Sequence, residues 1–526
     1  MTPDFDVIVV GSGPAGVSVA YPLVEAGLRV MMIDGGRKPG VQPPEADFHS
    51  ARANDSEQWK WMVGEDFHAL KKRDAVSPKL RVPSHAYAFE GFETSNQVVG
   101  KNFITVGSLA TGGLSNAWGC GVARFSAREM AAFPFPASEL AHSYATVSQR
   151  MGISGRTDDD LSDYFGLDEY SQPPIPMDVL HTRLSQYYSK QRIKLNAQGF
   201  RLGRSRVAVL SEEIAGRQPC NLSGNCLWGC RRHSMYSAAD DLPNLRKHGN
   251  FVEHSGFVVD RLTQQNGYWA VEGTTTSADE RRSITSSKII LAAGTLATTR
   301  LVLQTLNHRL PVPLLSSPTA AFLLWLPRLL GVPRTSGFGL GQLSFSLDLQ
   351  DNTTAFGSTF STTGISLSEF VRHVPLRRRY GIDLLQGLLS SCVVGNLFLP
   401  GHLTTAEAQL QSDASLIVTG KYCNLVEPLM NEATKKLRKA FWSLGAVLLP
   451  GSFTVGRPGG DIHYSGTFPM RKSPSLGETS QLGEVKELEG IFVVDGACLP
   501  TLSEKSHTLT IMANADRIGK QIAALS

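Results

Sequence analysis

The sequence predicts a fold of the α/β class, in which segments from both ends of the chain build one discontinuous nucleotide-binding domain. Near the start, the apolar run Asp6–Val10 leads directly into the glycine-rich turn Gly11–Gly16. Near the end, the apolar run Ile491–Val494 stops at the polar corner Asp495-Gly496. Short apolar runs bounded by glycine are typical of strands buried in a parallel sheet. The two runs therefore predict strands of one sheet, and a third run at 287–294 predicts a strand that returns the chain to it.

The glycine-rich turn has the form of a Rossmann-like dinucleotide fingerprint. It follows a predicted strand, opens a helical pattern that ends at Gly27, and precedes a second strand that ends at Asp34. Such glycines permit a tight turn, a close approach to a pyrophosphate and helix–strand packing, while the helix N-terminus stabilises the diphosphate charge. The carboxylate at the end of the second strand is positioned to accept hydrogen bonds from ribose hydroxyls. The contacts predicted here are Gly11, Ser12, Gly13, Pro14, Ala15, Gly16 and Asp34.

The fingerprint alone does not choose between NAD and FAD, but the layout of the chain favours FAD. The runs 251–262 and 268–274 predict strands of a hairpin-like insertion before the chain returns to the sheet at 287–294. A dinucleotide domain assembled from such scattered pieces is typical of flavoproteins rather than of NAD dehydrogenases. FAD is therefore the predicted cofactor.

Several motifs resemble those of the glucose–methanol–choline (GMC) oxidoreductases, FAD enzymes that oxidise alcohols and sugars. In chain order they are Gly11–Gly16, Ile289–Gly294, His463-x-x-Gly466-Thr467, Val493–Gly496, Pro500-Thr501 and the segment from His507 to Arg517. Together they cover the nucleotide domain, which is roughly half of the chain. The cofactor contacts that the resemblance implies in these later motifs are Ala293, Gly294, Asp495, Gly496 and Thr508.

The loop Thr111–Gly119 is similar to the Gly-Gly-x-Ser-x-His-Trp loop of the pyranose-oxidase branch, whose histidine is bonded covalently to the flavin. Ala117 stands at the position of that histidine, and an alanine cannot form the bond. The expected FAD is therefore noncovalent. The alternative is an ordinary glycine-rich surface loop, with Trp118 in the core. The flavin contacts predicted from this loop are Gly112, Gly113, Ser115, Asn116 and Trp118.

Two histidines carry the predicted chemistry. Oxidation of an alcohol by hydride transfer removes an O–H proton and a C–H hydride, and a neutral imidazole with a pKa of about 6.5 is suited to take the proton. By resemblance, His463 corresponds to the general base of the family and His507 to its partner, while hydride goes to flavin N5. The alternative for any single histidine is a structural or surface role. For these two, the flanking motifs favour catalysis.

The predicted activity is thus FAD-dependent oxidation of a CH–OH group in a sugar, a glycoside or another alcohol. O2 or another electron acceptor would reoxidise the cofactor, so the enzyme could be an oxidase or a dehydrogenase. Two rival hypotheses stay open. One is a non-oxidising flavoenzyme of the isomerase type, and the other is a catalytically silent flavin-binding partner of a membrane or an assembly.

The rest of the chain predicts an α+β substrate domain with an antiparallel sheet, and the resemblance implies that this sheet lies over the flavin. The segments 339–349 and 415–426 alternate apolar and polar residues, as strands with one buried face do. The expected division is 1–150, 205–310 and 455–526 for the FAD-binding domain, with 151–204 and 311–454 for the substrate domain.

Composition narrows the classes of partner and compartment. The 51 basic and 47 acidic residues leave a formal charge of +4, which is too balanced to predict nucleic-acid binding. The first predicted strand begins at Asp6 and leaves no room for a signal peptide. Seven cysteines, an odd number, fit a reducing compartment. Cytoplasmic location is the expectation.

Contact with a membrane surface is a further possibility in the sequence. No run reaches the ~18 apolar residues of a membrane span, and the run Ala320–Leu330 is interpreted as a buried helix. The arginines at 372 and 377–379 precede the apolar stretch Leu384–Pro400. A basic cluster beside apolar segments is typical of peripheral binding to anionic membranes, and the alternative is a solvated basic turn.

Three clustered cysteines leave a second question open. Cys220, Cys226 and Cys230 lie within eleven residues of one another, with His233 nearby. Such clusters can bind zinc or an iron–sulfur centre or form a redox disulfide, but no CxxC pair is present. Buried structural thiols at a tight turn are the favoured interpretation, and no metal is predicted.

Overall fold

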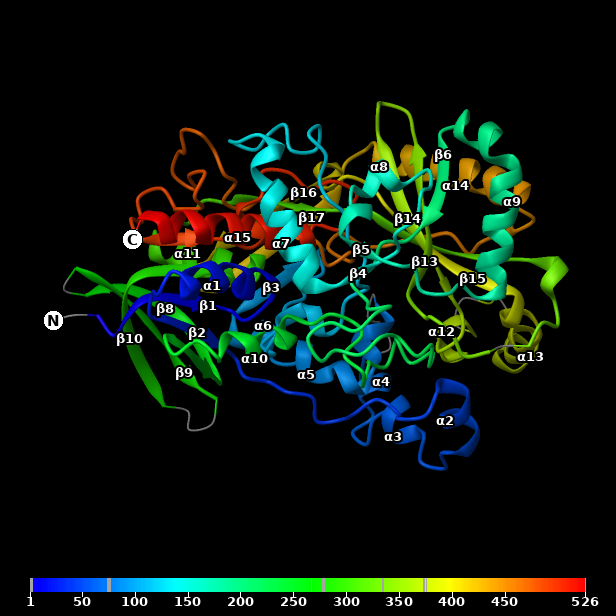
Figure 1. Ribbon diagram of the computed structural model, residues 1–526, viewed down its shortest axis with the longest axis horizontal. Coiled ribbons are helices and arrows are strands. Elements are labelled where there is room, and N and C mark those ends of the chain that lie inside the picture. Colours follow the sequence, from blue (N-terminus) through cyan, green and yellow to red (C-terminus); the bar gives the residue numbers. More distant parts are fainter. Residues whose placement is uncertain are drawn as a thin grey trace.

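The computed structural model describes residues 3–72, 77–265, 267–276, 280–333, 335–371, 374 and 376–525. The N-terminal and C-terminal segments lie at the same end of the molecule, and helices α9 and α14 lie at the opposite end (Figure 1). This arrangement brings the two ends of the chain together in the nucleotide-binding part, as the sequence predicts.

The first sheet, here called the nucleotide sheet, runs in the order β7-β2-β1-β10-β9-β8, and β21 also pairs with β10. The contacts of β1 with β2 and β10, of β2 with β7 and of β10 with β21 are parallel, whereas β8, β9 and β10 pair antiparallel. Its strands are β1 (Phe5–Val10), β2 (Val30–Asp34), β7 (Phe251–Ser255), β8 (Phe257–Gln265), β9 (Tyr268–Thr275), β10 (Arg281–Leu291) and β21 (Ile491–Val493). The predicted α/β class is confirmed.

Alternate side chains of β1 enter different cores because successive residues of a strand point to opposite faces. Val7 and Val9 pack with helices α1 (Pro14–Glu25) and α15 (Thr508–Leu525), whereas Ile8 and Val10 belong to the core beneath the other face. Gly519 of α15 packs so closely on α1 that a Cβ there would lie 2.6 Å from Pro22. Helices α7 (Ala141–Met151) and α11 (Thr295–Thr305) complete the layers around the sheet.

The predicted strand at 251–262 is two strands. Gly256 separates β7 from β8 with a φ of 83°, a left-handed conformation that glycine adopts without strain. The chain therefore leaves the parallel part of the sheet after β7 and begins the β8–β9 hairpin.

The second sheet runs in the order β20-β11-β16-β17-β3. Its strands are β3 (Val98–Lys101), β11 (Val312–Ser316), β16 (Thr404–Leu410), β17 (Leu416–Tyr422) and β20 (Tyr464–Ser465). Val312, Ala408 and Val418 share one hydrophobic core with Ile8 of the nucleotide sheet. This sheet thus packs with the nucleotide part, although β11, β16 and β17 lie within 311–454. The division into domains by sequence stays a prediction.

The third sheet, here called the substrate-side sheet, runs in the order β18-β12-β15-β14-β13-β6, with β19 also paired to β12. Its strands are β6 (Phe200–Arg204), β12 (Thr319–Trp325), β13 (Gly341–Asp348), β14 (Thr354–Ser361), β15 (Cys392–Phe398), β18 (Val447–Leu448) and β19 (Thr454–Val455). Helices α9 (Val179–Asn196) and α14 (Val426–Ser443) share a hydrophobic core with it. The strands predicted at 339–349 and 415–426 are both formed, as β13 and β17, but they belong to different sheets.

The interpretation of Ala320–Leu330 as a buried helix is wrong. Residues 319–325 form β12, and a short 3-10 turn follows at Pro327–Leu329. Ala320, Phe322 and Leu324 point into the core, so the period of burial is two. A short run that is apolar at every position hides this period, because its outward residues are also apolar.

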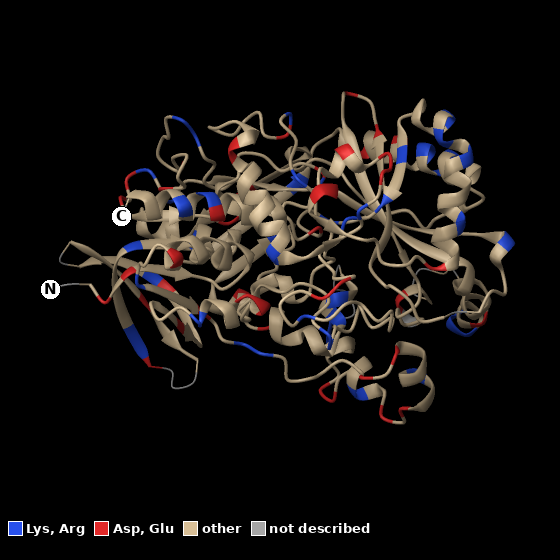
Figure 2. Ribbon diagram, in the orientation of Figure 1, with Lys and Arg blue, Asp and Glu red and all other residues tan. Residues whose placement is uncertain are grey.

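The remaining elements are short. They are α2 (Phe48–Asn54), α3 (Trp59–Met62), α4 (His68–Lys71), α5 (Ala86–Phe89), α6 (Phe92–Ser95), α8 (Ser162–Phe165), α10 (Leu242–Leu245), α12 (Ser368–Val371), α13 (Arg378–Leu388), β4 (Ile153–Ser154) and β5 (Ser171–Gln172). None of the helices in the described residues combines the length and the apolarity that crossing a membrane requires. Acidic and basic residues are scattered along the ribbon in Figure 2.

Candidate active site

The glycine-rich turn between β1 and α1 has the steric properties that its sequence predicts. Gly11 has a φ of 108°, and a Cβ there would lie 2.3 Å from the carbonyl oxygen of Ala292. A Cβ on Gly16 would lie 1.9 Å from the carbonyl oxygen of Gly11. Both positions therefore require glycine. Gly294, after β10, also adopts a positive φ of 87° at the start of α11.

The predicted flavin loop at 111–119 lies directly against this turn. A Cβ on Gly113 would lie 3.2 Å from the Cα of Gly13. The backbone N–H of Gly112 donates to the Ser12 hydroxyl at 3.0 Å, and Ser12 in turn donates to Asp34. Two segments that are about 100 residues apart in sequence thus form one backbone-lined cradle.

Several predicted contact residues use their side chains to hold this cradle together. Asp34 accepts hydrogen bonds from the Gly36 N–H at 2.8 Å and from the Ser255 hydroxyl at 2.9 Å. Asn116 donates to the carbonyl oxygens of Thr111 and Gly113 at 2.9 and 2.8 Å. Ser255 was not predicted, because its role follows from the pairing of β7 with β2. Other loop contacts are those of Ser115 with the Gly112 carbonyl, of Trp118 with the Tyr236 carbonyl and of Lys79 with the Trp118 carbonyl.

The corner at Asp495-Gly496 joins the end of β21 to the start of α11. Asp495 accepts hydrogen bonds from the Gly294 N–H at 2.9 Å, the Thr298 hydroxyl at 2.5 Å and the Ala497 N–H at 3.0 Å. Burial raises the pKa of Asp495 to about 6. Its carboxylate thus holds the two predicted cofactor segments at 293–294 and 495–496 together.

These residues fit a bound dinucleotide such as FAD. Gly13, Gly112 and Gly113 present backbone without side chains, and the last two have φ values of 90° and 61°. The N-terminus of α1 supplies free N–H groups for a diphosphate. The fold, the cradle and the acidic corner are all built from segments that the fingerprint and the resemblance indicated.

The structure brings the two predicted catalytic histidines into contact. The ring centroids of His463 and His507 lie 5.0 Å apart, with the planes at 73°. His507 is buried, whereas the His463 side chain remains 22% exposed. Among the described residues, neither Nδ1 atom has a hydrogen-bond partner. Burial lowers the pKa of His463 to about 4, and burial together with His463 lowers the pKa of His507 well below its usual value. Both rings are therefore neutral at pH 7.

An acid that sequence reasoning missed lies behind His463. The Asp461 carboxylate has no exposed surface, and its Oδ2 lies 3.8 Å from Nδ1 of His463. It accepts hydrogen bonds from the Ser316 hydroxyl and the Ser317 N–H, both at 2.7 Å, and burial raises its pKa to about 7. The sequence signal that could have revealed Asp461 is its position two residues before His463.

The residue between them, Ile462, has a φ of 60°. This left-handed conformation is strained for a β-branched residue, and such strain is concentrated at functional sites. The corner turns the Asp461 and His463 side chains toward each other. Tyr464 then enters β20, whose pairing with β11 fixes the corner against Ser316.

The substrate-side sheet contributes an aromatic wall. Phe398, at the end of β15, lies 5.4 Å from His463 between ring centroids. Burial alternates along β14 and β15, so one face of these strands enters the helix-covered core while the other is half-buried. Phe398 belongs to the half-buried face. Sequence reasoning predicted a sheet over the flavin, with strands at 339–349 and 415–426, but did not identify Phe398.

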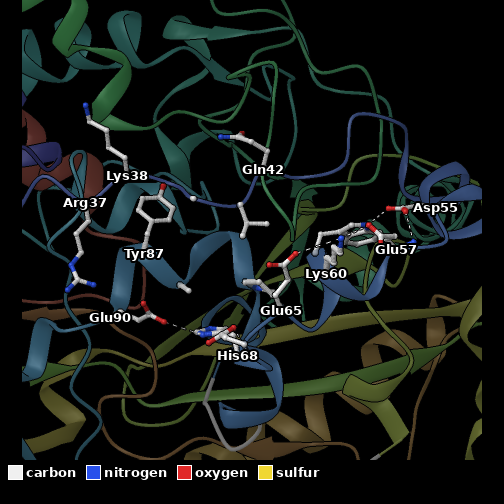
Figure 3. A pocket seen from close by; sticks show the side chains of 17 residues that line it. Arg37, Lys38, Gln42, Asp55, Glu57, Lys60, Glu65, His68, Tyr87 and Glu90 are labelled. Carbon is white, nitrogen blue, oxygen red and sulfur yellow. Dashed lines mark hydrogen bonds and ion pairs between the residues drawn. The ribbon is translucent and has the colours of Figure 1, made fainter.

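A separate cavity of about 900 Å³ is lined in part by the segment that follows β2. Figure 3 shows Arg37 and Lys38 at one end, with Glu90 and His68 below and Glu65 and Lys60 at the other end. His68 pairs with Glu90 at 3.4 Å, and Lys60 with Glu65 at 3.8 Å. The residues that line it include neither predicted catalytic histidine. It is therefore distinct from the histidine site.

The clustered cysteines form neither a disulfide nor a metal cluster in the described part of the chain. Cys220, Cys226 and Cys230 are free thiols, and no group of three or more potential ligands is found among the described residues. Burial raises the pKa of Cys226 to about 12, and its Sγ accepts a hydrogen bond from the Gly339 N–H at 3.4 Å.

Comparisons with known proteins agree with the fold. The family model of pyridine nucleotide-disulphide oxidoreductases matches residues 5–103, and that of GMC oxidoreductases matches residues 458–515, which contain both histidines. The chain is 24% identical to 2-methyl-1,2-propanediol dehydrogenase of Mycolicibacterium austroafricanum, over 98% of this chain and 95% of the relative. It is similar in fold to pyridoxine 4-oxidase from Mesorbium loti, with a TM-score of 0.60, 15% identity, and coverage of 98% of this chain and 99% of the other.

The nucleotide sheet, its glycine cradle and the matched families define an FAD-binding oxidoreductase. Within that class, the match over residues 458–515 and the relative that is 24% identical support a GMC oxidoreductase. The likeness to the pyranose-oxidase branch stays a prediction.

Proposed function

We propose that the protein oxidises the CH–OH group of an alcohol, with noncovalently bound FAD as hydride acceptor and His463 as general base. The observation that carries the proposal is the contact of two neutral, largely buried imidazoles in the segments that also hold the Asp495 corner. Bound FAD would supply the hydride-accepting N5 position. Ala117, in the cradle loop, has no atom that could attach covalently to it.

The proton chemistry belongs to the residues of this chain. His463 is neutral at pH 7 and can accept the hydroxyl proton of the substrate at Nε2. Its Nδ1 lies 3.8 Å from the Asp461 carboxylate, whose negative charge stabilises the imidazolium that forms. His507 holds the substrate oxygen from the other side, so that the C–H bond keeps a fixed direction.

The proposed substrate is an alcohol, and this class includes sugars and glycosides. The names of the two relatives, a diol dehydrogenase and a pyridoxine oxidase, favour alcohol oxidation over an isomerase reaction. The electron acceptor is O2 or another oxidant. Catalysis in the cytoplasm is part of the same proposal.

An anaerobic screen of purified holoenzyme tests this function. We expect at least one alcohol, diol or sugar to bleach the flavin absorbance without added reductant. A flavin that stays oxidised with every alcohol and sugar would contradict the proposal. Bleaching only after an added reductant, followed by isomerisation of a substrate, would favour the isomerase alternative.

We further propose that α13 contacts anionic membrane surfaces. Tyr380 and Leu384 of α13 are 59% and 45% exposed and lie four residues apart, which places them on one helix face, and Leu376, which is 51% exposed, precedes the helix. The exposed arginines at 377–379 flank this stripe, while Arg372 lies outside the described residues. Exposed apolar residues beside basic ones are typical of helices that lie in a membrane interface.

Flotation with liposomes tests this surface. The protein should float with anionic vesicles and stay behind with zwitterionic ones, and replacing the arginines at 377–379 by glutamine should abolish flotation. A matched variant with glutamine at Arg281 and Arg282, which pair with acids on the nucleotide sheet, should float like the wild type. Equal flotation of both variants would contradict the proposal.

A further inference from the structure

The aromatic wall continues from the histidine pair to a second polar group. Phe398 of β15 is directly paired with Phe356 of β14, so both rings project from the same face of the sheet. Phe398 contacts His463, and Phe356 stacks on Tyr164 of α8 with ring centroids 5.6 Å apart and planes at 21°. The wall thus reaches from His463 to Tyr164.

The Tyr164 hydroxyl donates a hydrogen bond to Oε1 of Glu504 at 3.0 Å. Glu504 precedes His507 by three residues in the same segment, so their Cα atoms lie within about 11 Å of each other. His507 contacts His463, so the chain segment 504–507 leads back to the histidine pair. The residues along this path are His463, Phe398, Phe356, Tyr164, Glu504 and His507.

The charge around Glu504 is not balanced. Glu504 is only 7% exposed, and the neighbouring ammonium group of Lys505 pairs with Glu129 at 2.9 Å. Lys505 also donates to the Arg124 carbonyl at 3.2 Å and lies 4.2 Å from the centre of the Tyr164 ring. The Arg124 guanidinium stacks on Tyr144 at 4.9 Å. Two carboxylates therefore share one ammonium group.

The hydrogen bonding of Glu504 is equally incomplete. Among the described residues, the Tyr164 hydroxyl is the one donor from another residue to its side chain, beside the backbone N–H of Glu504 itself. A buried carboxylate normally accepts several hydrogen bonds or pairs with a cation, since burial without them is costly. Burial and the nearby Glu129 raise the pKa of Glu504 to about 7, which reflects the missing partners. The group is thus ready to accept a further donor.

We propose that Glu504 and Tyr164 form a second polar subsite, which binds a hydrogen-bond donor of the substrate while His463 acts on the hydroxyl that is oxidised. The substrate then has two polar ends, the reacting hydroxyl and a second hydroxyl or a protonated amine, joined by carbon that packs on Phe356 and Phe398. The substrate class is a diol or an amino alcohol. This inference rests on the proposed function.

The test compares three substrates that share one carbon skeleton, an n-alcohol, the terminal diol and the amino alcohol, over a series of chain lengths. Anaerobic flavin reduction is measured for wild-type holoenzyme, Glu504→Gln and Tyr164→Phe. Glu432→Gln is the matched control, since this carboxylate pairs with Lys436 on α14. For each protein, kcat and KM are obtained separately.

At its best chain length, the wild type should prefer the diol or the amino alcohol over the n-alcohol by roughly tenfold or more in kcat/KM, because an n-alcohol leaves a buried polar group unpaired. Glu504→Gln should remove this preference mainly through KM, with the n-alcohol changed about twofold or less. If Glu504→Gln loses only the preference for the amino alcohol, the subsite recognises a cationic substrate. If the variant loses the preference for both the diol and the amino alcohol, the subsite recognises a hydrogen-bond donor that the two share. Tyr164→Phe, which keeps the aromatic ring, should weaken the preference in the same direction.

The outcomes separate this subsite from the proposed function. If alcohols bleach the flavin but the n-alcohol is used as well as the others, the subsite is wrong and alcohol oxidation stands. The same conclusion follows if Glu504→Gln slows all three substrates equally. If no alcohol bleaches the wild-type flavin, both proposals fall.

Discussion

The nucleotide sheet and the substrate-side sheet are built on opposite patterns of burial. The residues of β2 and β21 are buried throughout, and so are the last four of β1, because helices or another sheet cover both faces. Burial along β14 alternates residue by residue, so that one face enters a core and the other stays half-buried near the histidines. The first pattern positions a cofactor through backbone and turns. The second leaves side chains available for substrate. Cofactor binding and substrate choice should therefore respond to different substitutions.

The largest effect is expected at His463, at the boundary between the nucleotide sheet and the substrate-side sheet. His463→Ala removes the group that takes the substrate proton, and general base catalysis contributes about 10²- to 10⁴-fold. Anaerobic flavin reduction should slow by that factor at unchanged FAD content. His308→Ala, in the turn after α11, is the control. Equal rates for His463→Ala and wild type would remove His463 from the mechanism.

The second-largest effect on catalysis is expected from substitution of Asp461. Asp461→Asn keeps the shape but lacks the charge that stabilises the protonated His463, so kcat should fall by roughly tenfold to a hundredfold, less than the loss of the base itself. The pKa of this carboxyl is about 7, so wild-type kcat/KM should rise with pH up to about 7 and then level off. Below that pH the carboxyl is protonated and neutral. An unchanged pH profile in the variant would show that Asp461 does not act through His463.

A substitution in the cradle should affect the cofactor alone. Gly113→Ala places a Cβ 3.2 Å from Gly13 at a φ of 61°, so FAD binding should weaken by on the order of tenfold. The ratio of flavin to protein absorbance after dialysis measures this change. Gly121→Ala, whose Cβ meets no atom within 4 Å, is the matched control. Full FAD content in Gly113→Ala would contradict the proposed cradle.

The smallest effect is expected on the substrate side. Phe356→Ala should change the relative kcat/KM of alcohols by about 3- to 10-fold, because it removes apolar contact with bound carbon. FAD content should stay at the wild-type level. A loss of FAD in this variant, without a change in preference, would break the division between the two sheets.

The sequence was sufficient for the parts of the molecule that depend on local geometry. The turn at Gly11–Gly16 needs glycine because its backbone conformation and its neighbours leave no room for a Cβ, and this requirement is visible in the residues themselves. The strand–turn–helix order around it, and the return strand before Gly294, follow from short apolar runs between glycines. The contact of His463 with His507 could be anticipated through the resemblance of their flanking motifs.

The rest depends on contacts between distant segments. Ser255 reaches Asp34 because β7 pairs with β2, and Phe356 meets Phe398 because β14 pairs with β15. Neither pairing has a local signal. Glu504 stands beside Lys505 in the sequence, and its burial beneath Tyr164 appears only in three dimensions. The run at 320–330 was misinterpreted since its apolar residues fit a helix as well as a strand.

The most direct test of alcohol oxidation at the histidine pair is a primary deuterium isotope effect on anaerobic flavin reduction. The substrate is the best alcohol from the screen, unlabelled or deuterated at the carbon that bears the hydroxyl, and the proteins are wild type and His463→Ala at equal FAD content. We expect the deuterated alcohol to reduce the wild-type flavin several-fold more slowly, and the variant to be slower still with both. Reduction of the wild-type and variant flavins at the same rate, with no difference between the two alcohols, would contradict the proposed mechanism.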